Sequence, residues 1–131
     1  MPKRKLTRVE KQERDPIKSE SAFDEIKKFI NGESISLSSI NNALVDIDED
    51  NLPIMKKLDF GQLLDDLCNK VISNKYSYST QKEQYKLLKD NLTKHLNDLI
   101  AKNEKDKENS PIIASSFQKK IDKYNEYLNS L

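Results

Sequence analysis

Three acidic residues, Asp46, Asp48 and Asp50, alternate along the chain with the spacing that opens a calcium-binding loop. Such a loop needs glycine at its sixth position for a sharp turn and glutamate at its twelfth as a bidentate ligand. Asn51 and Lys57 occupy those two positions here. We therefore interpret the segment as a solvated acidic helix end, and we expect no calcium site.

Nucleophilic or metal chemistry would have to use Cys68 and His95, the only cysteine and the only histidine of the chain. A zinc site needs several ligands at recognisable spacing, and these two residues do not form such a set. No surrounding segment resembles an oxyanion-stabilising turn, and no glycine-rich phosphate loop is present. We expect a protein that is not an enzyme and has no metal or cofactor. The alternative is a minor enzyme or metal protein that uses these residues or the acidic segment.

Two regulatory motifs lie together between Asp106 and Pro111. The triplet Lys107, Glu108, Asn109 resembles the KEN degron, which activators of the anaphase-promoting ubiquitin ligase read in short accessible segments. Ser110 precedes a proline, which is the minimal site of proline-directed kinases, and a phosphate there would lie near the start of the last predicted helix. Together the motifs predict cell-cycle control. A lysine-rich loop that ends in a helix-starting proline explains the same residues without regulation.

The charge of the chain is concentrated at its beginning. Residues 1–18 carry seven basic and three acidic side chains, whereas the remaining 113 residues carry 16 basic and 19 acidic ones. Few apolar residues accompany this charge, so we predict a disordered basic tail over 1–18 and a helical domain over 19–131. Nuclear import or phosphate contact would use four cations of the tail: Lys3, Arg4, Lys5 and Arg8.

Length and composition exclude several classes of protein. The 131 residues suffice for one domain, and hydrophobic residues make up 35% of them against 34% charged residues. No run approaches the roughly 18 apolar residues of a membrane-spanning helix, and a single cysteine excludes a disulfide scaffold. The basic start is not followed by an apolar stretch, so we expect no secretory signal. A reducing compartment, and specifically the nucleus, is the predicted location.

Helical spacing of apolar residues dominates after the tail, and β-strand alternation hardly occurs. The first predicted helix covers 21–31, with Ser21 as its cap, and a weaker one starts near residue 38 or 39 and ends in the acidic segment. After a turn over 51–58, the third helix starts at Asp59, which forms a capping-box pair with Gln62. A longer helix covers 80–105 and opens with a capping box at Thr80. A polar break from Asn103 to Ser110 ends it. The last helix follows Pro111. The fold class is therefore an all-α bundle of four to five amphipathic helices.

Three of these helices carry apolar stripes, which we expect to form the core and a groove for a partner. The stripes are Phe60, Leu63, Leu64, Leu67 and Val71 on the third helix, Tyr85, Leu88, Leu92, Leu96 and Leu99 on the fourth, and Phe117, Ile121, Tyr124 and Leu128 on the last.

The modest apolar content favours a chain that completes its core on other protein subunits, in a hetero-complex rather than a homo-oligomer. We predict a non-enzymatic helical subunit or adaptor of a eukaryotic nuclear complex, associated with chromosomes or chromatin. The alternative is a nucleic-acid-binding protein that makes phosphate contacts through its basic tail. Neither interpretation involves a membrane.

Overall fold

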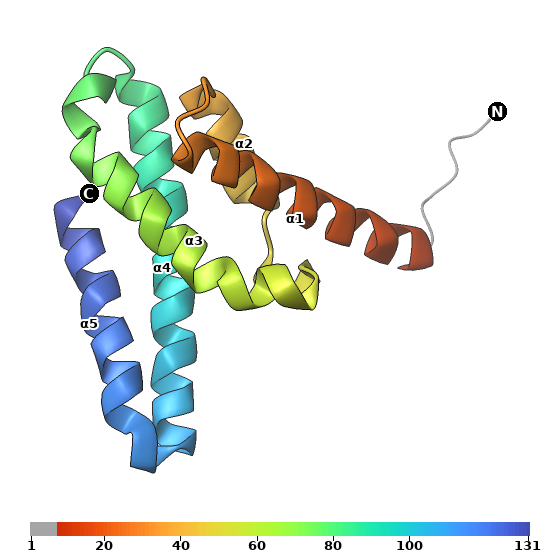
Figure 1. Cartoon of the computed structure of the whole chain (residues 1–131), viewed down its shortest axis with the longest axis vertical. Helices are drawn as coiled ribbons and strands as arrows, with labels where there is room; N and C mark the ends of the chain where they lie inside the picture. The colour runs from red at the N-terminus through yellow and green to blue at the C-terminus, as the bar shows by residue number, and fades with distance from the viewer. Residues whose placement is uncertain (1–7) are drawn as a thin grey trace. The chain divides into compact units, whose positions relative to one another are not determined.

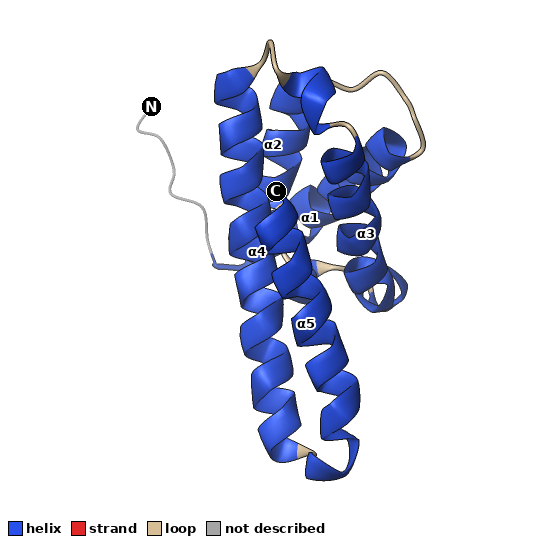
Figure 2. Cartoon of the chain, turned by 90° about the vertical axis from the view of Figure 1, so that its left-hand side faces the viewer, coloured by secondary structure: helices blue, strands red, loops and turns tan. Residues whose placement is uncertain are grey.

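The chain is all-α over the residues that the structure describes, as the sequence predicts. This computed structural model describes residues 8–131, with side chains from Ile17 onward. That range holds five α-helices and three short 3-10 helices and no strand (Figure 2). Of the predicted basic tail, residues 1–7 lie outside the described residues, and so do the candidate import residues Lys3, Arg4 and Lys5.

The chain divides into two compact units between Asp66 and Leu67, inside the helix α3 (Ile54–Ser73). The first unit contains α1 (Arg8–Ile30), α2 (Leu37–Asp46), the 3-10 turn η1 (Glu49–Asn51) and the beginning of α3. The second contains the end of α3, η2 (Lys75–Tyr78), α4 (Lys82–Asn109), η3 (Pro111–Ile113) and α5 (Ala114–Ser130) (Figure 1).

Helix α1 stops where the sequence predicts, because Gly32 adopts a φ of +92° that other residues rarely reach. The amide of Gly32 donates to the carbonyl of Phe29 (3.1 Å), and the amide of Glu33 donates to the carbonyl of Lys28 (3.1 Å). These two bonds form a Schellman motif, which satisfies carbonyls at the end of the helix. The beginning of α1 differs from the prediction, since the helix starts at Arg8 and Ser21 is an exposed residue within it.

A buried serine fastens α1 to the segment that follows α2. Ser19 is fully buried, and its hydroxyl donates to the carbonyl of Asp46 (3.3 Å) and accepts from the amide of Asp48 (2.9 Å). One side chain thus satisfies two backbone groups where α2 has ended and no helical partner remains for them. Helix α2 itself begins after Ser36, whose hydroxyl accepts from the amide of Ser39 (3.1 Å), slightly before the predicted start.

Helix α3 begins at Ile54, more than a turn before the predicted cap at Asp59, and the prediction of a turn over 51–58 is wrong for residues 54–58. Pro53 accounts for the earlier start: its fixed φ and missing amide suit a helix beginning, and its carbonyl accepts from the amide of Lys57 (2.8 Å). The expected capping partner, Gln62, donates instead to the carboxylate of Asp66 one turn later (2.9 Å).

Helices α4 and α5 lie side by side as an antiparallel hairpin, closed by η3 (Figures 1 and 2). The predicted capping box at Thr80 is wrong, because α4 begins after Gln81 and no side chain caps it. The predicted polar break over 103–110 is also wrong except at Ser110. Asn103 is buried in α4, and its side-chain amide donates to the carbonyl of Leu99 (2.7 Å). The polar side chain thus has a hydrogen-bond partner within the helix, and the helix continues past it.

None of the helices within residues 8–131 is both long enough and apolar enough to cross a lipid bilayer.

The position of Ser19 generates a stability prediction. In Ser19→Ala the amide of Asp48 loses its acceptor at a partly buried position, so we expect the free energy of unfolding to fall by about 1–3 kcal/mol in urea denaturation. Ser21→Ala, an exposed site in the same helix, is the matched control and should change the value by less than roughly 0.5 kcal/mol. Equal effects of the two substitutions would contradict this role of Ser19.

Candidate functional site

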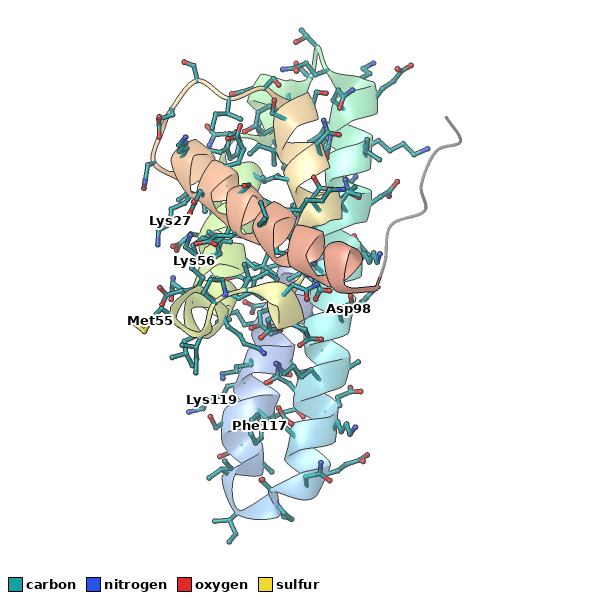
Figure 3. The ribbon with its side chains drawn as sticks, turned by 90° about the vertical axis from the view of Figure 1, so that its right-hand side faces the viewer. Lys27, Met55, Lys56, Asp98, Phe117 and Lys119 are labelled. Atoms are coloured by element: carbon teal, nitrogen blue, oxygen red, sulfur yellow. The ribbon has the colours of Figure 1, made fainter. Side chains whose placement is uncertain are left out.

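The predicted apolar stripes are buried inside the chain itself. Phe60, Leu63, Leu64, Leu67 and Val71 of α3 are buried, as are Leu88, Leu92, Leu96 and Leu99 of α4 and Ile121 and Tyr124 of α5. The remaining three members, Tyr85, Phe117 and Leu128, are half-buried. Phe117 lies on the side of α5 toward α4, while Lys119 projects from the other side (Figure 3). The stripes are therefore core residues of this chain, and the expected partner groove along them is not open.

A different apolar surface is exposed at the beginning of α3. Ile54, Met55 and Leu58 have exposed fractions of 74%, 72% and 75%. A helix turns about 100° per residue, so these three side chains share one arc of its surface, and we call them the α3 turn. Met55 extends into solvent from this turn (Figure 3). Large apolar side chains gathered on one exposed surface are typical of a binding site.

Lys56 orients the α3 turn. Its ammonium donates to the carboxylates of Asp24 (2.8 Å) and Glu20 (3.0 Å) on α1, and it lies 5.6 Å from the ring centre of Phe23. The hydrogen bond to Asp24 raises the pKa of Lys56 against the opposing effect of desolvation. Because Lys56 and the buried Phe60 lie on the opposite side of the helix, this attachment to α1 directs the α3 turn outward.

Charged residues flank the α3 turn on both edges. By helical geometry Lys57 lies next to Ile54 on one edge, and Asp59 lies next to Met55 on the other, and both are exposed. The surface thus combines an apolar centre with one cation and one anion on opposite edges, which is the composition of a protein-binding surface with a defined orientation.

The residues considered for nucleophilic or metal chemistry do not form a site in the described part of the chain. Cys68 is fully buried, so its thiol is shielded from any substrate, and His95 is half-buried. Among residues 17–131 no group of three or more histidine, cysteine, aspartate or glutamate side chains could hold a metal ion. In the acidic segment, the carboxylate of Asp48 accepts from the amide of Asp50 (3.0 Å) and from the side-chain amide of Asn51 (3.0 Å). Asp48 is thereby the N-cap of η1.

The KEN-like triplet occupies the last turn of α4 and not a loop, contrary to the expectation. Glu108 and Asn109 are exposed, and Lys107 is half-buried and donates to the side chain of Gln118 on α5 (2.7 Å). Ser110 caps the end of α4 and does not begin α5, which starts at Ala114 after η3. Ser110 is also the N-cap of η3, which leads directly into α5, so the residue lies near the start of the last helix as the sequence predicts.

Two tyrosines pack together at the beginning of the second unit. The rings of Tyr78 and Tyr85 lie 5.8 Å apart, and the hydroxyl oxygen of Tyr85 is buried without a hydrogen-bond partner. Desolvation raises the pKa of Tyr85. Desolvation also raises the pKa of Tyr78, and electrostatic repulsion from the neighbouring Tyr85 phenolate raises it further. Neither group lies in a cluster that would use it for chemistry, so we assign both to packing.

Sequence reasoning missed the α3 turn because it placed residues 51–58 in a connecting turn. A signal was present: Pro53 is followed by isoleucine and leucine four residues apart, the spacing of one helix face. Comparison with protein families, curated proteins and solved structures finds no match to this chain.

The tyrosine pair generates a pH prediction. Folding raises both pKa values, so the unfolded chain loses its phenol protons at lower pH than the folded chain does. The contribution of the two neutral tyrosines to folding stability is therefore complete below about pH 10, and it is lost as the pH rises through the raised values. We expect an ultraviolet titration of tyrosinate to contain a late component that Tyr85→Phe reduces. Tyr76→Phe removes a tyrosine that is 84% exposed and should leave this component in place. An unchanged titration in Tyr85→Phe would contradict the assignment.

Proposed function

We propose that this chain is a non-enzymatic helical subunit or adaptor that binds another protein through the α3 turn. The observation that supports this function is the exposure of Ile54, Met55 and Leu58 in a chain that buries the aliphatic stripes of its helices. Burying one such side chain contributes about 1.5–3 kcal/mol, so three together can anchor a complex.

The partner that fits the α3 turn is an amphipathic helix of a different protein. A short row of aliphatic side chains on a helix packs well against the ridges of another helix. Lys57 and Asp59 would face an acidic and a basic residue on the two edges of that helix, which sets its direction. A specific interface buries roughly 800 Å² on each partner, and three side chains supply only part of that area. The partner must therefore also contact residues outside the α3 turn, in the hetero-complex that we propose.

The location that we propose for this complex is the nucleus of a eukaryotic cell, in association with chromosomes or chromatin. The support comes from the sequence, since three consecutive cations at Lys3, Arg4 and Lys5 resemble a short import signal. The KEN-like triplet and the Ser-Pro pair add support for cell-cycle control. Direct phosphate contact by the same cations is the alternative use of this segment.

A substitution in the α3 turn tests the proposed function. In Leu58→Asp a charge replaces the apolar centre of the surface, so we expect partner capture by the immobilised chain to fall tenfold or more. Stability should change little, since the side chain is 75% exposed. The matched control is Ile112→Asp in the second unit, where the isoleucine is 97% exposed and lies outside the α3 turn. Its capture should equal that of the unmodified chain.

Two results would contradict this proposal. Capture that is the same for Leu58→Asp and the unmodified chain would remove the α3 turn from the interface. Sedimentation of the isolated chain as a dimer that Leu58→Asp dissociates would assign the surface to a second copy instead of a different protein.

The basic segment has its own test. Alanine at Lys3, Arg4 and Lys5 together should shift a fluorescently tagged chain from the nucleus to the cytoplasm of a yeast or human cell. If the localisation is unchanged and the salt-dependent affinity for duplex DNA falls instead, the segment makes phosphate contacts, as the alternative function requires.

A further inference from the structure

Ser110 is the one residue outside helical structure between Lys82 and Ser130, a range that the structure describes completely. Its dihedral angles, φ −134° and ψ 69°, are non-helical, as expected for a residue that precedes proline. Ser110 is half-buried, but its neighbours are accessible: Asn109 and Pro111 are exposed, and Ile112 has an exposed fraction of 97%. Protein kinases bind short accessible segments, and the residues around Ser110 offer one where α4 ends.

Ser110 is followed by Pro111, and no other serine or threonine of the 131 residues precedes a proline. The 3-10 turn that follows is held by the bond from the amide of Ile113 to the carbonyl of Ser110 (3.2 Å). Ile112 and Ile113 are both exposed and do not anchor this turn in a core. Opening it to an extended conformation therefore exposes little additional apolar surface.

A relay of side chains connects the two helices of the hairpin next to Ser110. Lys107 of α4 donates to the amide oxygen of Gln118 (2.7 Å), and the amide nitrogen of Gln118 donates to the carboxylate of Asp122 (2.8 Å). Lys107 lies in the last turn of α4, directly before Ser110 at its C-cap, so its ammonium is within reach of a group on the Ser110 side chain.

We propose that Ser110 is a phosphorylation site of a proline-directed kinase and that the phosphate loosens the end of the α4–α5 hairpin. The kinase transfers the γ-phosphoryl group of ATP to the Ser110 hydroxyl. The bond between Oγ and phosphorus forms, the bond from phosphorus to the bridging oxygen breaks, ADP leaves, and the hydroxyl proton passes to the kinase base and then to solvent. This inference stands on the second unit and does not rest on the proposed binding through the α3 turn.

The direction of the effect follows from the charges around Ser110. A phosphate dianion accepts hydrogen bonds more strongly than a neutral amide oxygen, so it draws Lys107 away from Gln118. The carboxylates of Asp106 and Glu108 repel it, and the carbonyl end of α4 disfavours it. Ser110 is the N-cap of η3, but Pro111 has no amide hydrogen and the amide of Ile113 already donates to the carbonyl of Ser110, so this turn offers the phosphate few free donors. The amide end of α5 lies beyond η3, and dipole effects decline within one turn. The disruptive contributions therefore dominate.

The first experiment treats the full chain with a purified proline-directed kinase and ATP and maps the product by mass spectrometry. We expect one phosphate per chain, on Ser110, and its loss in both Ser110→Ala and Pro111→Ala. Ser115→Ala, which changes an exposed serine five residues away that lacks a following proline, is the matched control and should be phosphorylated normally. Absence of phosphate, or phosphate on another residue, would overturn the site.

The second experiment compares hydrogen exchange of the phosphorylated and unmodified chains. We expect amides of residues 104–118 to exchange roughly three- to tenfold faster after phosphorylation, the size that fits loss of one side-chain hydrogen bond between the helices. In Lys107→Met this contact is already removed, so phosphorylation should accelerate exchange less than in the parent chain. Unchanged or slower exchange in the phosphorylated parent, or an equal acceleration in Lys107→Met, would overturn the mechanism.

Discussion

Burial of one narrow aliphatic stripe on each main helix is the interaction on which this fold depends. Charged residues are almost as numerous as hydrophobic ones, so the outer faces of the helices cannot supply a second core. Leu64, Leu67, Leu92 and Leu96 have no measurable exposure, and each contributes roughly 1.5–3 kcal/mol of burial free energy. A chain with so little apolar surface to spare nevertheless leaves three large apolar residues of one helix turn in water. That contrast gives the beginning of α3 its functional interest.

Much of the fold could be predicted from the sequence, because a stripe at helical spacing depends only on the order of residues along the chain. The all-α class and the Gly32 stop of α1 were predicted correctly, and most members of the stripes on the last three helices are buried. Helix starts were the weak point. Asp59 and Thr80 each begin a pattern that resembles a capping box, but α3 starts earlier and α4 starts later. A helix cap contributes only about 1 kcal/mol, so other interactions can outweigh it. The contact of Lys56 with α1 joins residues far apart in the sequence, and no local pattern predicts it.

The candidate site could be predicted less well than the fold, for a related reason. Exposure is a property of the packed molecule, and an apolar residue in the sequence predicts burial by default. Ile54 and Leu58 therefore escaped notice, while the stripes proposed as a partner groove are buried in the chain's own core. The polar residues show the opposite error: Asn103 was read as part of a break between helices, yet it is buried inside α4 with its amide bonded to the preceding turn.

The single cysteine has a practical consequence. Cys68 is fully buried in α3, and the chain contains no other thiol. A thiol reagent can reach it only when the surrounding side chains separate, so the rate of modification reports how often this part of the core opens. Because no second cysteine exists, no intramolecular disulfide competes with that reaction. The natural chain thus carries a kinetic probe of its own interior, without a label or a substitution.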